Sequence, residues 1–358
     1  MKRLKMLILN CICLSMFLCN PAYANNIVLP SPDWGPAVEI GLERVLRAPN
    51  GLLYTRNDKK TFLSETHSLE MELAALRGDL KRFKTQVSLM QKYFVSPSGL
   101  LAWELSSTGK KATSNASIDD LRTCYALLLA DELWPKENFK KPLITLAEKI
   151  RIYNTENDTL LDGASWKQSW FKPLAITKNT SELTLSYADL RAMKMLAKRD
   201  ENWLPILVKT SGFVITGLFL EEKNAWGYSF EKKEFTYNEE NLINTMLHLH
   251  FLSSIGIIPT SYGRKYAIEL LSTGKITDKS GNENITVYAL ASLFFKDCGF
   301  DEAAEKAYSK LSDFIIDEGK YKGLLGYEQE DKTQTVWAFD NLIALIAREL
   351  LYKVKISM

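Results

Sequence analysis

The chain has 358 residues, with 45 Lys and Arg against 43 Asp and Glu and a formal net charge of +2 at pH 7. This near balance gives no support for nucleic-acid binding, which needs a basic excess. The histidines show no metal-ligand pattern, because His248 and His250 are two residues apart and face different sides of a helix. No glycine-rich phosphate loop is visible. We therefore expect neither a metal nor an organic cofactor.

The first 24 residues have the pattern of an export signal. A positive start (residues 2–5) is followed by an apolar stretch (residues 6–18) that is too short to span a membrane. Ala22-Tyr23-Ala24 is a good cleavage site and predicts a mature protein beginning at Asn25. An uncleaved anchor is the alternative.

The cysteines agree with export and suggest no disulfide framework. Cys124 and Cys298 remain in the mature chain, both in apolar helical contexts, so we expect buried free thiols; a disulfide between them is the alternative. Lipid attachment at Cys19 is disfavoured by the bulky residues before it. We expect a single domain over 25–358, monomeric, secreted or at the cell surface, and without stable membrane insertion after cleavage.

Apolar residues recur with the 3.6-residue period of a helix in about a dozen segments. In chain order these are 35–47, 65–78, 80–94, 118–134, 138–153, 183–198, 202–221, 239–254, 262–272, 284–298, 301–317 and 334–353. No strong alternating run predicts competing strands. Short and long connections alternate, which fits an all-α (α/α)6 barrel of six inner and six outer helices with its long loops on one face. A stack of helical repeats is the alternative, but no fixed-period consensus is visible.

Two predicted helices open with acidic residues. Glu65 follows Ser64 at one start, and Asp119 and Asp120 stand at another. A carboxylate there can cap the helix or point into a cleft. Adjacent side chains on a helix diverge by about 100°, so only one of Asp119 and Asp120 is expected to face a cleft. Two acidic groups on opposite sides of one bond are what glycoside hydrolysis uses.

Aromatic residues gather in the long connections. Trp103, Trp166, Trp170, Trp226 and Tyr228 all lie there. Aromatic faces stack on sugar rings, but for any single tryptophan hydrophobic packing is the role that we expect. The set as a whole favours an oligosaccharide groove.

These features together resemble glycoside hydrolase family 8 over roughly residues 34–350. The motifs that carry the resemblance are Ser64-Glu65, Ala116-Ser117-Ile118-Asp119-Asp120 with Ala126-Leu127-Leu128-Leu129-Ala130, Leu185-Ser186-Tyr187 and Phe339-Asp340-Asn341-Leu342. Thr66 replaces the family's usual glycine, and Ile118 stands in place of a first aspartate. The combination is similar to the Gram-positive branch associated with exopolysaccharide loci.

The resemblance implies an (α/α)6 barrel, inversion at the anomeric carbon and Glu65 as general acid. It implies that Asp120, or else Asp119, holds the sugar at the cleavage point. Contacts to sugar are expected from Trp103, Tyr187 and Arg122, and Arg122 can equally be a structural partner of Asp119 or Asp120.

One position departs from the family pattern. Asn244 stands where the family usually has its catalytic base, an aspartate. An amide cannot deprotonate water, but it can hold water by hydrogen bonds. Glu239 and Glu240 are candidate bases, and first-turn surface charges are the alternative for both.

We therefore expect a secreted glycoside hydrolase that cleaves within a β-linked polysaccharide, an exopolysaccharide by its motifs, through an inverting mechanism. Asn244 leaves open a non-catalytic glycan-binding protein on the same scaffold. A polysaccharide lyase on an α/α toroid is a further alternative, and it would need a Tyr or His base.

Overall fold

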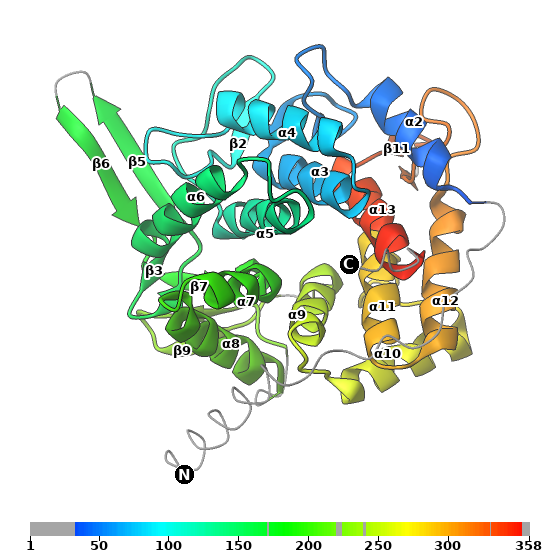
Figure 1. Ribbon diagram of the computed structural model, residues 1–358. Helices are drawn as coiled ribbons and strands as arrows, with labels where there is room; N and C mark the ends of the chain where they lie inside the picture. Colours follow the sequence, from blue (N-terminus) through cyan, green and yellow to red (C-terminus); the bar gives the residue numbers. More distant parts are fainter. Residues whose placement is uncertain (1–32, 170–171, 220–223, 239–240, 330, 353–358) are drawn as a thin grey trace, which may run out of the picture.

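The computed structural model describes residues 33–169, 172–219, 224–238, 241–329 and 331–352, and its helices form two concentric rings (Figure 1). The inner helices are α3 (Ser64–Leu76), α5 (Ser117–Leu133), α7 (Leu190–Arg199), α9 (Leu242–Ser254), α11 (Ile285–Asp297) and α13 (Ala338–Tyr352). The outer helices are α2 (Gly35–Val45), α4 (Leu80–Tyr93), α6 (Lys140–Tyr153), α8 (Trp203–Phe219), α10 (Thr260–Thr273) and α12 (Asp301–Lys310). Each inner helix packs on the next, and α13 packs on α3 to close the ring. The predicted (α/α)6 barrel is confirmed.

The two rings differ in how much of each helix is apolar. In α11 every residue from Ile285 to Phe295 is buried, whereas α6 buries only a stripe at Leu143, Leu146, Ala147 and Ile150. A helix that is apolar on all sides needs cover on all sides, while an amphipathic helix can face water. Sequence pattern therefore decides which helices lie inside.

The predicted helix over 183–198 starts later than expected. Its first residues form strand β7 (Glu182–Thr184) and a 3-10 turn, η1 (Leu185–Tyr187), and α7 begins only at Leu190. Asp189 caps α7 by accepting hydrogen bonds from the Arg191 and Ala192 N–H groups. The segment predicted over 301–317 likewise ends its α-helix at Lys310 and continues as 3-10 helix η2 (Leu311–Phe314).

The expectation that no strands compete was wrong for the connections, which carry small antiparallel sheets. The pairs are β1 (Thr61–Leu63) with β2 (Glu104–Ser106), β3 (Thr155–Glu156) with β4 (Thr159–Leu160), β5 (Ala164–Ser169) with β6 (Lys172–Lys178), and β10 (Tyr327–Glu328) with β11 (Gln334–Thr335). A three-stranded sheet joins β7, β8 (Gly227–Ser229) and β9 (Glu234–Thr236). The β5–β6 hairpin forms an arm that extends beyond the barrel (Figure 1). Strands of two or three residues carry too few positions for an alternation signal, whereas β5 and β6 are longer and were not predicted.

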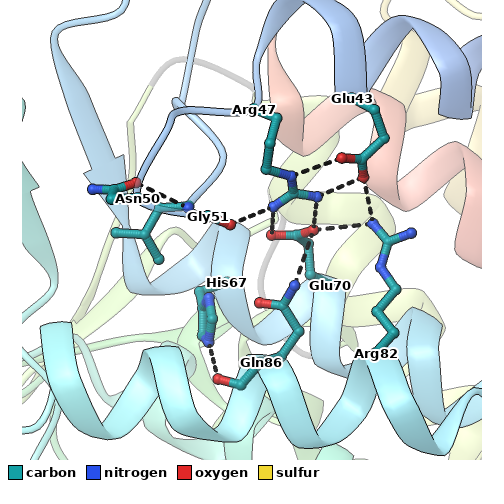
Figure 2. A network of polar contacts seen from close by, with 9 residues as sticks. Glu43, Arg47, Asn50, Gly51, His67, Glu70, Arg82 and Gln86 are labelled. Atoms are coloured by element: carbon teal, nitrogen blue, oxygen red, sulfur yellow. Dashed lines mark hydrogen bonds and ion pairs between the residues drawn. The ribbon is translucent and has the colours of Figure 1, made fainter.

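A buried polar network holds α3 against the outer ring (Figure 2). The Glu70 carboxylate is fully buried and lies 2.6 Å from the Arg47 guanidinium and 3.1 Å from that of Arg82. One turn earlier, His67 donates from Nε2 to the Gln86 carbonyl oxygen at 2.8 Å. These contacts fix the rotation of α3 about its axis, and with it the direction in which its first turn points.

Cys124 is buried, Cys298 is partly buried, and both are free thiols, as predicted. No helix in the described ranges is long and apolar enough to cross a membrane. The predicted export signal, Trp170, Glu239 and Glu240 lie outside the described residues.

Candidate active site

The N-terminal ends of the inner helices share one face of the barrel, because each outer helix returns the chain to the same side. This topology gathers residues that are far apart in sequence. Glu65, Asp119, Asn244 and Asp340 each lie in the first turn of an inner helix, and Tyr187 lies just before α7.

Glu65 is paired with a buried cation. Its side chain is 28% exposed, and Oε1 lies 2.7 Å from Nη1 of Arg122, which is only 2% exposed. The Arg122 guanidinium also lies 4.0 Å from Asp119 and 5.6 Å from the centre of the Phe339 ring. Ser64 is not the cap of this helix, because it lies inside the first turn and makes no capping bond. The Glu65 carboxylate is thus partly exposed, and the buried Arg122 guanidinium holds it in place.

Asp119 supports Glu65 from the neighbouring helix. Its Oδ2 accepts the Ser64 hydroxyl at 2.6 Å, and the carboxylate also accepts the Glu65 N–H. Burial, helped by the negative charge of Glu65, raises the pKa of Asp119 to about 7 despite the nearby Arg122. Near neutral pH this carboxyl can therefore hold or release a proton beside Glu65.

Asp120 points elsewhere. It is fully buried, and its two oxygens accept the Leu101 N–H at 3.0 Å and the Asn115 side-chain amide. Burial raises the pKa of Asp120 well above its usual value. The structure brings Asp119, and not Asp120, next to Glu65, and Asp120 instead anchors the loop that carries Trp103.

A cavity of about 620 Å³, which we call the Trp103 cavity, lies next to this cluster, because the carbonyl oxygen of its lining residue Trp103 accepts the Ser64 N–H at 3.0 Å. Glu65, Asp119 and Arg122 are not among its described lining residues. Trp103 is 39% exposed and lines it together with Tyr187 and Asp162. Burial and the charges of Asp119 and Asp162 raise the pKa of Tyr187 to about 12, which keeps its hydroxyl protonated. Trp166 is 5% exposed and packs in the core, the role expected for any single tryptophan of the set.

Asp162 is a site residue that the sequence motifs missed. Its carboxylate accepts the Thr184 N–H at 2.5 Å and the Thr184 hydroxyl at 2.7 Å. Burial raises the pKa of Asp162 to about 6. A Cβ on the next residue, Gly163, would lie 2.5 Å from the Asn115 carbonyl oxygen, so glycine permits the close approach that shapes this wall. The Asp-Gly pair is the signal that marks the turn in sequence.

Asn244 lines a second cavity of about 460 Å³, the Asn244 cavity. Trp226, Tyr262 and His248 also line it, which places Trp226 where a sugar-stacking residue was expected. Tyr228 does not join them: its ring packs 4.5 Å from that of Phe213 in an aromatic cluster. The two cavities adjoin the same ring of helix starts, because η1 packs on α9.

Asp340 belongs to the late Phe-Asp-Asn-Leu motif, for which the sequence suggested no role. It accepts the Thr286 hydroxyl at 2.6 Å, and burial raises its pKa to about 6 with a contribution from the charge of Glu65. Asp340 is therefore a further carboxyl within the electrostatic reach of Glu65.

Glu72, seven residues after Glu65 on α3, is a structural residue. It is 1% exposed and pairs with Arg191 at 2.9 Å inside the barrel. Arg191 also pairs with Asp189 at 2.8 Å. Among the described residues, no group of three or more His, Cys, Asp or Glu is arranged to hold a metal ion.

No family model matches the sequence. The putative lipoprotein YdaJ of Bacillus subtilis (strain 168) is 26% identical over 324 residues, covering 84% of this chain and 83% of that protein. A solved structure described as a novel alpha-amylase from Clostridium perfringens has a TM-score of 0.78 at 23% identity, covering 91% of this chain and 100% of that chain.

PssZ from Listeria monocytogenes has a TM-score of 0.67 at 21% identity and covers 92% of this chain and 97% of its own. Endoglucanase Cel10 from Klebsiella pneumoniae, a family 8 glycosyl hydrolase, has a TM-score of 0.61 at 13% identity, with coverages of 88% and 99%. The fold is that of glycoside hydrolase family 8. The resemblance inferred from the motifs is thus confirmed by the three-dimensional structure.

The family 8 fold explains why the motif residues converge although they are spread over much of the chain. Glu65, Asp119, Arg122 and Tyr187 meet because α3, α5 and α7 are consecutive inner helices. Asn244 lies on the same face, in the first turn of α9, but it lines the Asn244 cavity and not the Trp103 cavity.

Proposed function

We propose that this protein is a glycoside hydrolase that cleaves a β-linked polysaccharide with inversion of configuration. The observation that carries the proposal is the partly exposed Glu65 carboxylate, fixed by Arg122 and flanked by Asp119 beside the Trp103 cavity, on a family 8 fold. A positioned carboxylic acid next to an aromatic-lined cavity is what protonation of a glycosidic oxygen requires.

In the proposed reaction Glu65 protonates the leaving oxygen. Arg122 pairs with Glu65 and lies 4.0 Å from Asp119, and the negative charge of Glu65 helps to raise the pKa values of Asp119 and Asp340, which favours keeping a proton within the group. Asp119 contacts the sugar at the cleavage point and stabilises positive charge at its anomeric carbon. Trp103 supplies a stacking surface, and the protonated Tyr187 hydroxyl a hydrogen bond.

Inversion also needs a base that activates water from the opposite side of the sugar. Asn244 cannot serve, because an amide has no useful basicity. We assign this role to Asp162, the carboxylate among the described residues lining the Trp103 cavity. Its pKa of about 6 leaves it ionised, and able to accept a proton, at neutral pH.

The substrate class rests on the motif resemblance and on solved neighbours described as endoglucanases. One neighbour is described as an alpha-amylase, so starch belongs in the same assay as β-glucans. The exopolysaccharide substrate follows from the late motifs of the Gram-positive branch. Export to the cell surface is supported by the signal pattern of residues 1–24 and by a relative described as a putative lipoprotein.

The test measures new reducing ends from mixed-linkage β-glucan, carboxymethyl cellulose, starch and an exopolysaccharide preparation. NMR of the first product gives the anomeric configuration. Glu65→Gln is expected to lower hydrolysis by about 10³-fold, because an amide cannot protonate the leaving oxygen. Glu148→Gln, on the exposed side of α6, is the matched control and is expected to keep full activity.

Unchanged hydrolysis by Glu65→Gln would contradict the assignment of the acid. A second candidate function, glycan binding without cleavage, is favoured by Asn244 at the usual base position. Oligosaccharide binding without any new reducing ends after long incubation would decide for that function.

A further inference from the structure

The Asn244 cavity has a lining unlike that of the Trp103 cavity. It is lined by amide, aromatic and hydroxyl side chains and by two lysines, Lys265 and Lys279, and no carboxylate stands among its described lining residues. The lining residues include Asn224, Trp226, Asn244, Thr245, His248 and Tyr262.

Two buried polar atoms in this wall have no hydrogen-bond partner. Nδ2 of Asn244 is one, and Nε2 of His248, a residue only 2% exposed, is the other. The two residues are four apart on α9, so their side chains lie on the same helix face. Buried polar groups in folded proteins are nearly always satisfied, and a ligand in the cavity that these two residues line can supply the missing partners.

The polar groups beside this pair are already occupied within the protein. The Tyr262 hydroxyl lies 2.7 Å from Oδ1 of Asn224 and 2.6 Å from the Leu218 carbonyl oxygen, and Asn224 Nδ2 donates to Thr245 at 3.3 Å. This part of the wall is therefore fixed. Among the buried side-chain atoms of the described lining residues, Asn244 Nδ2 and His248 Nε2 are the two without a partner.

The donor and acceptor groups of Asn244 and His248 limit the chemical classes of ligand that can satisfy both side chains. Burial lowers the pKa of His248 to about 4, so its ring is neutral at pH 7 and carries one donor and one acceptor nitrogen. The Asn244 amide offers an N–H donor. An acetamido group presents one carbonyl acceptor and one N–H donor on a flat unit, which matches a donor next to an acceptor.

We propose that the Asn244 cavity binds an N-acetylated sugar unit of the polysaccharide. Asn244 Nδ2 donates to the acetyl carbonyl oxygen, His248 Nε2 accepts the acetamido N–H, and Trp226 packs against the sugar ring. The inference rests on the proposed function, since it places the chain of the same substrate along the face that carries Glu65. It also gives the asparagine at the usual base position a role of its own.

The test compares two β-1,4-linked tetrasaccharides, cellotetraose and N-acetylchitotetraose, which differ only in a hydroxyl or an acetamido group at C2. Isothermal titration calorimetry on the Glu65→Gln protein measures both Kd values without turnover. We expect the acetamido ligand to bind about tenfold more tightly, the gain that satisfying a buried donor supplies. Asn244→Asp replaces Nδ2 by an oxygen that cannot donate, and it is expected to bring the ratio of Kd values to about 1.

Asn50→Asp is the matched control, because Asn50 lies in the loop after α2 and uses only its Oδ1, which accepts the Leu52 N–H. It is expected to keep the tenfold ratio. Thermal melts establish that each variant is folded, and Asn244→Leu repeats the test if the aspartate variant is not. Equal Kd values in the parent, or an unchanged ratio in either Asn244 variant, would overturn the inference.

The two proposals can fail separately. An acetamido preference together with no hydrolysis by the protein with Glu65 intact would leave this inference standing and remove the proposed catalysis. Hydrolysis that depends on Glu65 without any acetamido preference would do the reverse.

Discussion

The hydroxyl of Ser64 donates to the carboxylate of Asp119 at 2.6 Å, and this bond joins α3 to α5 at the position where Glu65 enters the active face. The same carboxylate accepts the Glu65 N–H. Asp119 therefore acts on Glu65 in two ways, through the backbone of its helix turn and through charge. Its sequence neighbour Asp120 has no such contact and bonds instead to the loop over 100–115.

Because of this difference, we expect an aspartate-to-asparagine substitution to impair catalysis at Asp119 and stability at Asp120. Asp119→Asn is expected to lower kcat/KM by about 10²-fold, because an amide cannot carry the negative charge that stabilises the sugar at the cleavage point, while its oxygen can still accept the Ser64 hydroxyl. Asp120→Asn places an amide donor against the Asn115 donor and is expected to cost about 1–3 kcal/mol of unfolding free energy. Steady-state kinetics and chemical denaturation of both variants distinguish the roles, and a reversed pattern would assign the sugar-holding role to Asp120.

The raised pKa of Asp119 predicts a pH-dependent stability difference. An unfolded aspartate titrates near 3.8, whereas Asp119 titrates at about 7 in the folded protein. Above pH 4 the folded state therefore binds more protons at this site, and its contribution to stability is lost as pH rises through 7. Between pH 6 and 8 the loss is about 1.4 kcal/mol.

Buried histidines work in the opposite direction, since burial lowers the pKa values of His67, His248 and His250. The measurement is therefore the difference between Asp119→Asn and the wild type. Urea denaturation should show the variant gaining about 1.4 kcal/mol relative to the wild type from pH 6 to pH 8. A difference that is constant over this range would contradict the raised pKa.

The sequence was sufficient to predict the helices but not to predict which side chains at their N-terminal ends face one another. Long amphipathic and all-apolar segments predict helices because their periodicity extends over several turns, and Glu65 was found because it lies in a recognisable motif. Which of Asp119 and Asp120 faces Glu65 depends on the rotation of α5 against α3, which adjacent residues in one motif cannot reveal. Trp166 lies in β5, a strand that was not predicted, and its side chain packs in the core. Asp162 was missed because its hydrogen-bond partner, Thr184, lies in β7, 22 residues later in the chain.

The buried network of Figure 2 predicts where α3 is vulnerable. Glu70→Gln removes the charge that pairs with Arg47 and Arg82 and is expected to cost roughly 3 kcal/mol, because two guanidinium groups lose their buried partner. Glu43→Gln is the control: Glu43 pairs with the same arginines, but its side chain is 48% exposed, so the expected cost is below about 1 kcal/mol. Equal costs in urea denaturation would show that burial of Glu70 does not set its contribution.

The assignment of Asp162 as base predicts both the effect of its removal and a chemical rescue. Asp162→Asn is expected to lower kcat by 10²–10⁴-fold, because its amide cannot accept the proton of the attacking water. Asp158→Asn is the control, since Asp158 lies in an exposed turn nearby with a positive φ that asparagine tolerates. This variant should keep the wild-type rate.

Azide gives the sharper test, because it attacks the anomeric carbon without losing a proton and so needs no base. Added azide should restore sugar release by Asp162→Asn as a glycosyl azide of inverted configuration, while Glu65→Gln should not respond on a substrate whose leaving group needs protonation. The wild-type kcat should also fall as pH drops below about 6, where protonated Asp162 can no longer accept a proton. Full activity of Asp162→Asn, or an absence of rescue, would place the base on another carboxylate.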